Sequence, residues 1–219
     1  MAGEKINYDY ITEYLHQVLP ESDGYLKEME DYAHANEVPI IHKEMKSFLE
    51  VLCKLHKPLK ILEIGTAIGY SASVMALASG KDCHITTIER DSDMTTLALE
   101  NIERLELSNQ IRVIEGDGLE VLSCLSSKYD MIFIDAAKGY YNEFFDYAIN
   151  LINDGGLIVS DNVLYKGMTA EDAIVKRRQK TIVGRMRDYL VMLCNHPSLT
   201  TSIIPIGDGV ALSYFKKMR

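Results

Sequence analysis

The sequence predicts an α/β fold: a Rossmann-like sheet of seven strands that is mostly parallel and ends in an antiparallel hairpin. Three observations predict it. Short apolar runs alternate with helical segments from residue 60 to residue 162, the pattern of parallel strands joined by helices. Two strand-like runs flank Gly207-Asp208-Gly209 near the end of the chain, which is a hairpin signal. Amphipathic segments precede the first strand, so we expect extra N-terminal helices.

The spacing of apolar residues predicts each helix and strand, and the residues that break this spacing predict where each one ends. The segment Pro20–Gly24 separates the first two helices, and Pro58 ends the third. The expected helices are 6–19, 25–35, 42–56, 71–79, 92–106, 118–126, 141–152 and 171–195. The expected parallel strands are 60–65, 84–89, 111–117, 130–135 and 155–162.

Length and composition narrow the class of protein. A chain of 219 residues with 47% apolar and 25% charged residues is ordinary for a globular domain. We expect a single domain over 1–219, with N-terminal helices in 1–57 and the α/β core in 58–219. The sequence contains no long apolar run of membrane-spanning length and no secretory pattern at its start. Four scattered cysteines favour free thiols, so we expect a cytoplasmic protein without a membrane partner.

Charge is unevenly distributed along the chain. From residue 166 to the end there are ten Lys or Arg and four acids, a net charge of +6, against −15 for residues 1–165. A basic C-terminal quarter is compatible with a polyanionic partner. On charge alone, a solvated helix face explains it at least as well.

A glycine-rich turn and a series of acids lie at the expected strand ends. Gly65 and Gly69 stand in LEIGTAIGYS, between the first strand and a helix, where a backbone can approach a ligand closely. Glu89 ends the second strand, where an acid can accept hydrogen bonds from ribose hydroxyls. Asp117 ends the third strand, where an adenine would lie. A tight structural turn and a helix cap remain alternative interpretations.

Side chains with carboxylate or amide oxygens also lie at the ends of the next two strands. Asp135 ends the fourth, and Asp161 and Asn162 end the fifth. Carboxylate and amide oxygens suit a hard cation such as Mg²⁺, which could orient a substrate hydroxyl and lower its pKa. Lys138 lies three residues beyond Asp135 and could remove the hydroxyl proton or steady the oxyanion. Helix caps and a surface lysine explain these residues equally well at this point.

Several motifs together resemble a known family. KILEIGTAIGYSA, TIER, GDGLE, MIFIDAAKGYYNEFF and IVSDNVLYKG are similar to the cation-dependent class I O-methyltransferases of the caffeoyl-CoA and catechol type, over nearly the whole chain. The segments HANEVPI, DNVLYKGMTAED, KRRQK and NHPSLTTSIIPIGDGVALS most resemble a bacterial branch, the tRNA 5-hydroxyuridine methyltransferases. The resemblance implies transfer of a methyl group from S-adenosylmethionine to wobble 5-hydroxyuridine, giving 5-methoxyuridine.

The resemblance also implies roles for individual residues. It places S-adenosylmethionine against Ile41, Gly65, Ser71, Glu89, Asp117, Gly118 and Asp135. It makes Asp135, Asp161 and Asn162 the ligands of Mg²⁺ or another divalent cation, and Asp135 and Lys138 the catalytic residues. It places the anticodon loop of tRNA against Lys176, Arg177, Arg178 and Lys180, and it favours a homodimer.

Other functions remain open from the sequence. A small catechol-like metabolite could be the acceptor at the same site, in which case the basic segment would be irrelevant. A non-catalytic protein that binds S-adenosylmethionine would not need Asp161. A nicotinamide dehydrogenase is disfavoured, because the glycine turn lacks the middle glycine of GxGxxG.

Overall fold

The computed structural model describes residues 6–218 as a seven-stranded sheet with the strand order β3-β2-β1-β4-β5-β7-β6. The described residues divide into two compact units, one covering 13–124 and the other the remainder. The mixed sheet, parallel except for its C-terminal hairpin, confirms the expected fold class.

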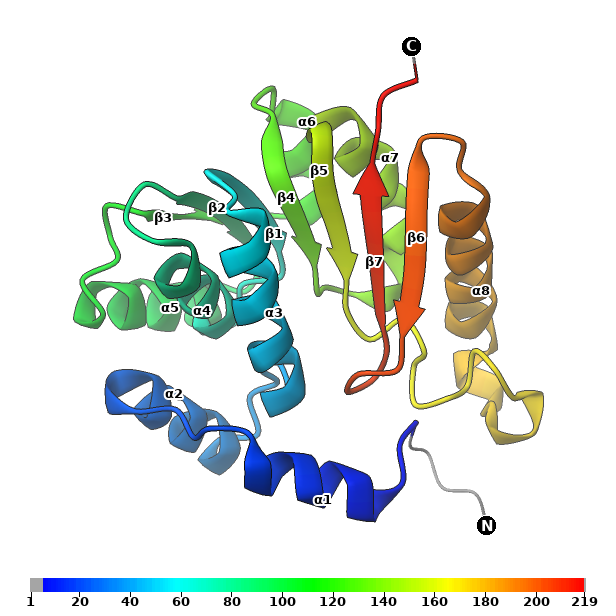
Figure 1. The fold of residues 1–219 in the computed structure, drawn as a ribbon, viewed down its shortest axis with the longest axis horizontal. Coiled ribbons are helices and arrows are strands. Elements are labelled where there is room, and N and C mark those ends of the chain that lie inside the picture. The colour runs from blue at the N-terminus through cyan, green and yellow to red at the C-terminus, as the bar shows by residue number, and fades with distance from the viewer. Residues whose placement is uncertain (1–5, 219) are drawn as a thin grey trace. The chain divides into compact units, whose positions relative to one another are not determined.

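The unit of residues 13–124 carries three parallel strands and the N-terminal helices. Its strands are β1 (Lys60–Ile64), β2 (His84–Glu89) and β3 (Ile111–Glu115), and β2 pairs in parallel with both neighbours. Its helices are α2 (Gly24–Ala35), α3 (Lys43–His56), α4 (Tyr70–Ser79), α5 (Ser92–Arg104) and α6 (Gly118–Cys124) (Figure 1). The division between the two units falls within the sequence of α1 (Asp9–Val18).

Local chemistry explains where these elements begin and end. The apolar residues of β1 are buried along the whole strand after Lys60. Gly69, with φ of 81°, turns the chain directly before α4, a conformation that glycine adopts at little cost. Asp91 caps α5 by accepting hydrogen bonds from the backbone N–H groups of Asp93 and Met94.

The second unit contains the other four strands and two main helices. They are β4 (Tyr129–Ile134), α7 (Tyr141–Leu151), β5 (Ile152–Ser160), α8 (Lys180–Asn195), β6 (Leu199–Ile204) and β7 (Val210–Phe215), with short 3-10 turns η1 (Lys138–Tyr140), η2 (Asp172–Ile174) and η3 (Arg177–Gln179). β4 pairs with β5 in parallel, whereas β7 is antiparallel to both β5 and β6 (Figure 1). The expected C-terminal hairpin is therefore confirmed.

The predicted helix 171–195 is wrong in its first nine residues. In the structure α8 begins only at Lys180, and two separate 3-10 turns, η2 and η3, precede it. Val175 and Lys176 between them are extended. Contacts of the first residues hold them in short turns: the Glu171 side chain accepts a hydrogen bond from the N–H of Ala173, and Asp172 lies 2.7 Å from Arg187 of α8.

Candidate functional site

The glycine loop, residues 65–69, joins β1 to α4 through several left-handed residues. Gly65 has φ of 103°, Ala67 of 44° and Gly69 of 81°. The N–H of Gly65 donates to the carbonyl of Ile88 at 3.0 Å, and that of Gly69 donates to the carbonyl of Thr66 at 2.8 Å. Ala67 is the position where a side chain is present despite positive φ, which costs conformational energy. The loop therefore depends on contacts with its surroundings to keep this shape.

Glu89, at the end of β2, supplies one of those contacts. Its Oε2 accepts a hydrogen bond from the N–H of Ala67 at 2.8 Å. Its Oε1 accepts from the N–H groups of Arg90 at 2.9 Å and Asp91 at 3.0 Å. The acid that the sequence assigns to a ribose thus lies beside the glycine loop and fixes its backbone.

Asp117 and Gly118 lie where β3 leads into α6. Asp117 Oδ1 accepts from the N–H of Leu119 at 2.9 Å and more weakly from that of Glu120 at 3.4 Å. The helix-cap interpretation weighed from the sequence is therefore the one that the hydrogen bonds show, with Gly118 as the first residue of α6. Contact of these residues with an adenine stays a prediction.

A buried carboxylate that sequence reasoning missed lies within β1. Glu63 is fully buried, and its oxygens accept hydrogen bonds from the hydroxyls of Ser71 and Thr87, both at 2.5 Å. Thr87 in turn lies 2.6 Å from the hydroxyl of Thr66. Ser71, assigned to the cofactor from the sequence, therefore joins a buried polar network beneath the glycine loop. The only signal for Glu63 was an acid inside the apolar run KILEIG.

Ile41 lies just ahead of α3 and is buried, with 6% of its surface exposed. An apolar side chain in this position is as consistent with a core role as with the cofactor contact expected from the sequence. That contact stays a prediction.

In the other unit, Asp135 and Asp161 form an acid pair at the ends of adjacent strands. Ile134 of β4 is in register with Ser160 of β5, so the next residue on each strand is an aspartate. The N–H of Asp161 donates to the carbonyl of Ile134 at 2.9 Å. The buried hydroxyl of Tyr141 donates to the carbonyl of Asp161 at 2.9 Å. The expected juxtaposition of these two acids is thus present.

Asp161 is electrostatically unusual. Its Oδ1 accepts a hydrogen bond from the N–H of Asn162 at 2.6 Å, whereas its Oδ2 is buried and has no hydrogen-bond partner within residues 6–218. Burial, together with the nearby charge of Asp135, raises the pKa of Asp161 to about 7, although Asn162 and Lys138 act in the opposite direction. A buried oxygen with no donor beside a second carboxylate is what a cation would stabilise.

Lys138 and Asn162 meet beside this acid pair. Lys138 Nζ donates to Asn162 Oδ1 at 2.7 Å and lies 5.6 Å from the centre of the Tyr165 ring. Asn162, Tyr165 and Lys166 all have positive φ, so the backbone after β5 holds an uncommon conformation. Asp135, Asp161, Asn162 and Lys138 are therefore brought together as the sequence predicts.

The hairpin turn between β6 and β7 supports the segment that carries Asn162. The N–H groups of Val163 and Leu164 donate to the carbonyls of Gly209 at 2.9 Å and Asp208 at 3.0 Å. The N–H of Lys166 donates to Asp208 Oδ1 at 2.5 Å. A Cβ added at Gly209 would clash with Leu164 at 2.4 Å, so this close approach requires glycine.

The basic C-terminal residues fall into two groups. Arg185 binds Glu143 and the carbonyl of Gly139, and Arg187 lies 2.7 Å from Asp172 and donates to the carbonyls of Met168 and Thr169. These two arginines are thus engaged inside the unit. The second group is the basic segment Lys176–Lys180, in which Lys176, Arg177, Arg178 and Lys180 are exposed to solvent.

Two further features are absent from residues 6–218. No cluster of three or more His, Cys, Asp or Glu side chains there has the arrangement of a metal site, and the cation ligands expected above are two acids and one amide. No helix in this range is long and apolar enough to cross a membrane.

Comparison with known proteins identifies the family. The profile of a family described as O-methyltransferase matches residues 16–216. The chain belongs to this O-methyltransferase family. This confirms the prediction of an S-adenosylmethionine-dependent O-methyltransferase of the caffeoyl-CoA and catechol type at the level of the family.

Individual relatives span nearly the whole chain. A catechol O-methyltransferase from Niastella koreensis is 31% identical and aligns over 95% of this chain and 98% of its own. A structure from Staphylococcus aureus, described as that of a caffeoyl-CoA O-methyltransferase, has 36% sequence identity to this chain and a TM-score of 0.88. The match covers 94% of this chain and all of the Staphylococcus aureus chain. A Bacillus cereus O-methyltransferase solved with S-adenosylhomocysteine is 26% identical with a TM-score of 0.83, covering 94% and 97% of the two chains.

Proposed function

We propose that this methyltransferase binds S-adenosylmethionine at the glycine loop and methylates one oxygen of a substrate that presents two adjacent oxygens to a divalent cation. Asp135, Asp161 and Asn162 would hold that cation. The observation that carries the proposal is the buried Oδ2 of Asp161, which has no hydrogen-bond partner in the described part of the chain and lies beside a second carboxylate, in a chain of the O-methyltransferase family.

The bound groups would supply most of the chemistry. A divalent cation acts as a Lewis acid that favours the ionised form of a coordinated hydroxyl, and Mg²⁺ prefers such oxygen ligands. Glu89 would accept the ribose hydroxyls of the cofactor, as an acid at the end of the second strand does in related nucleotide-binding folds. Its hydrogen bond to the N–H of Ala67 would keep the loop in place for binding.

Lys138 and Asn162 would orient the acceptor. Lys138 Nζ is held by Asn162 Oδ1 at 2.7 Å, so its remaining N–H donors are directed by the protein. From that position Lys138 would steady the developing oxyanion or receive the hydroxyl proton. Because holding the reactants in place lowers the entropic barrier, positioning is the main contribution of these side chains.

For the acceptor we propose 5-hydroxyuridine at the wobble position of tRNA, and for the protein a homodimer. Its 5-hydroxyl and 4-carbonyl oxygens form an adjacent pair. The exposed Arg177, Arg178 and Lys180 support the proposal, because phosphate binding needs cations that the protein has not already neutralised. An anticodon base is also easily unstacked into a pocket.

A small catechol is the second candidate. The observation in its favour is the Niastella koreensis relative, which carries the name catechol O-methyltransferase and aligns over nearly its full length. A catechol offers the same adjacent oxygens and needs no basic segment.

The deciding experiment uses purified protein with S-adenosylmethionine and Mg²⁺, and either tRNA that contains 5-hydroxyuridine or free catechol. Nucleoside mass spectrometry would measure 5-methoxyuridine, and chromatography would measure methylated catechol. We expect a higher kcat/KM on tRNA. Turnover of catechol with no methylation of tRNA would contradict the tRNA assignment and favour the second candidate.

A further inference from the structure

Helix α2 reaches the glycine loop through Asn101 of α5. The hydroxyl of Tyr25 in α2 donates to Asn101 Oδ1 at 2.6 Å, and Asn101 Nδ2 donates to the carbonyl of Ile68 at 2.9 Å. Asn101 is buried, with 9% of its surface exposed. Because both ends of its amide are engaged, the orientation of Asn101 follows from its partners.

Arg104 of α5 contacts both the ring and the hydroxyl of Tyr25. The guanidinium of Arg104 lies 3.9 Å from the centre of the Tyr25 ring, and Arg104 Nη1 donates to the Tyr25 hydroxyl at 3.0 Å. Arg104 also pairs with the exposed Glu28 at 3.3 Å. The hydroxyl of Tyr25 therefore receives one hydrogen bond and donates another, which directs its proton towards Asn101.

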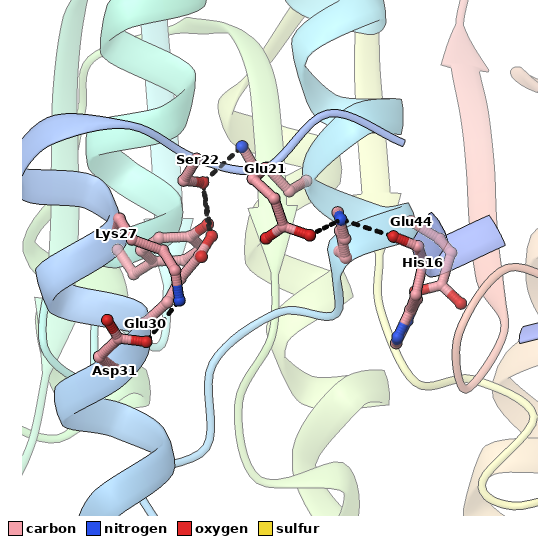
Figure 2. A network of polar contacts seen from close by, with 10 residues as sticks. His16, Glu21, Ser22, Lys27, Glu30, Asp31 and Glu44 are labelled. Atoms are coloured by element: carbon pink, nitrogen blue, oxygen red, sulfur yellow. Dashed lines mark hydrogen bonds and ion pairs between the residues drawn. The ribbon is translucent and has the colours of Figure 1, made fainter. Parts of the chain in front are cut away.

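A second contact runs from α2 to the first residue of α4. The hydroxyl of Tyr70, directly after Gly69, donates to Glu30 Oε1, and Ser22 Oγ donates to the same oxygen at 2.5 Å. The buried Lys46 donates to Ser22 Oγ at 2.5 Å. Figure 2 shows Ser22 and Glu30 within this network, together with the Lys27–Asp31 pair and Glu21. Burial and the hydrogen bond to Glu30 raise the pKa of Tyr70, so its hydroxyl stays protonated and remains a donor.

These two contacts meet the glycine loop on both sides of Gly69. One fixes the carbonyl of Ile68 and the other the side chain of Tyr70. Gly69 itself packs on Ala98 of α5, where an added Cβ would lie 3.4 Å from the Ala98 side chain. Within this loop, Ala67 is a non-glycine residue in the left-handed conformation, and such a conformation persists only when surrounding contacts hold it.

We propose that α2 is a positioning element for the cofactor, with Tyr25, Asn101 and Glu30 as positioning residues that keep the glycine loop in its binding shape. The inference rests on the proposed function in one respect, namely that the glycine loop binds S-adenosylmethionine. It adds that affinity for the cofactor is set in part by a helix outside the α/β core. These residues act through Ile68 and Tyr70 and do not themselves take part in methyl transfer.

The test measures S-adenosylhomocysteine binding to the full chain by titration calorimetry, since this ligand needs no acceptor. Tyr25→Phe and Tyr70→Phe each remove one hydroxyl oxygen. We expect each to raise the Kd about fivefold, the equivalent of one hydrogen bond of ordinary net strength. Asn101→Ala should raise it further. The KM for S-adenosylmethionine should rise in parallel, while kcat at saturating cofactor stays within about twofold, because uniform binding is what these residues supply.

The matched control is Tyr32→Phe, which removes a hydroxyl from the same helix at a side chain that is 42% exposed. It should leave the Kd unchanged. Unfolding in urea is measured for every variant. Lower stability of Tyr25→Phe and Tyr70→Phe with an unchanged Kd at low temperature would show that α2 only stabilises the fold, and would overturn the proposal.

The same experiment separates this inference from the proposed function. The ratio of variant to wild-type Kd tests the role of α2 whatever the acceptor is. Wild-type protein that binds S-adenosylhomocysteine but methylates neither tRNA nor catechol would contradict the proposed function while leaving that ratio decisive.

Discussion

The glycine loop and the acid pair are both polar regions at strand ends, but they satisfy their charges in opposite ways. Around the glycine loop the protein supplies the partners: Glu89 accepts three backbone hydrogen bonds, and Glu63 accepts two from hydroxyls. At the acid pair, Asp161 Oδ2 is buried with no hydrogen-bond donor in the described chain, and the pKa of Asp161 is raised.

This difference indicates two kinds of binding site. A region whose polar groups are already paired can be rigid before a ligand arrives, and preorganisation lowers the cost of binding. A region with an uncompensated buried carboxylate is stabilised only when positive charge arrives or a proton is taken up. The first suits an organic cofactor, and the second suits a cation. The following predictions test this contrast, from the largest expected effect to the smallest.

Removal of the Asp161 carboxylate should have the largest effect on activity. Asp161→Ala is expected to lower kcat by about a thousandfold, since a Lewis-acid contribution of several kcal/mol would be lost. Binding of S-adenosylhomocysteine, measured by calorimetry, should change little. Asp146→Ala on the exposed face of α7 is the control. Full activity of Asp161→Ala would refute the cation site.

The charge of Asp161 should also appear in the pH dependence of stability. Its pKa is raised from 3.8 to about 7, so between these values the folded state holds the proton that the unfolded state releases. The free energy of unfolding should therefore fall as pH rises through this window, by roughly 4 kcal/mol at most. Urea denaturation with EDTA present measures it.

A substitution and a ligand should each reduce this pH dependence of the free energy of unfolding. Asp161→Asn has no charge to titrate, and saturating Mg²⁺ would compensate the carboxylate, so both should leave stability less dependent on pH than in the metal-free wild type. The same slope with and without Asp161 would show that other groups are responsible.

The basic segment separates the two candidate acceptors. Arg177→Ala with Arg178→Ala should reduce kcat/KM on tRNA about thirtyfold at physiological salt if each arginine neutralises one phosphate. Activity on catechol should not change. Lys216→Ala with Lys217→Ala removes the same charge elsewhere in the C-terminal segment and serves as the control. An equal loss on both acceptors would argue against tRNA binding by these arginines.

Substitution of Glu89, whose carboxylate is hydrogen-bonded to the glycine loop, should have a smaller effect on cofactor binding. Glu89→Gln is expected to raise the Kd for S-adenosylhomocysteine about tenfold, because charge-assisted hydrogen bonds become neutral ones. Glu115→Gln at the exposed end of β3 is the matched control. An unchanged Kd would exclude Glu89 from cofactor binding and from support of the loop.

The expected elements were largely recovered because their patterns are local. The apolar run Met131–Ile134 of strand β4 is followed by Asp135, and Asp161 follows a similar run. In a parallel pair such ends must meet at one edge of the sheet, so the acid pair could be anticipated. The start of α8 could not, because the contacts that hold the preceding turns, such as the ion pair of Asp172 with Arg187, join residues that are far apart in the sequence.

The sequence by itself determined the order of strands and helices, the position of each acid at a strand end, and the family. Those properties depend on the spacing of apolar residues, on turn residues and on motifs, all of which are local features of the sequence. Only the tertiary structure decided that Glu63 is buried with two hydroxyl donors, that Asp161 Oδ2 has no donor among residues 6–218, and that Asn101 joins Tyr25 to the carbonyl of Ile68. Burial and pairing depend on residues distant in sequence, and these set the pKa of Asp161 and the support of the glycine loop.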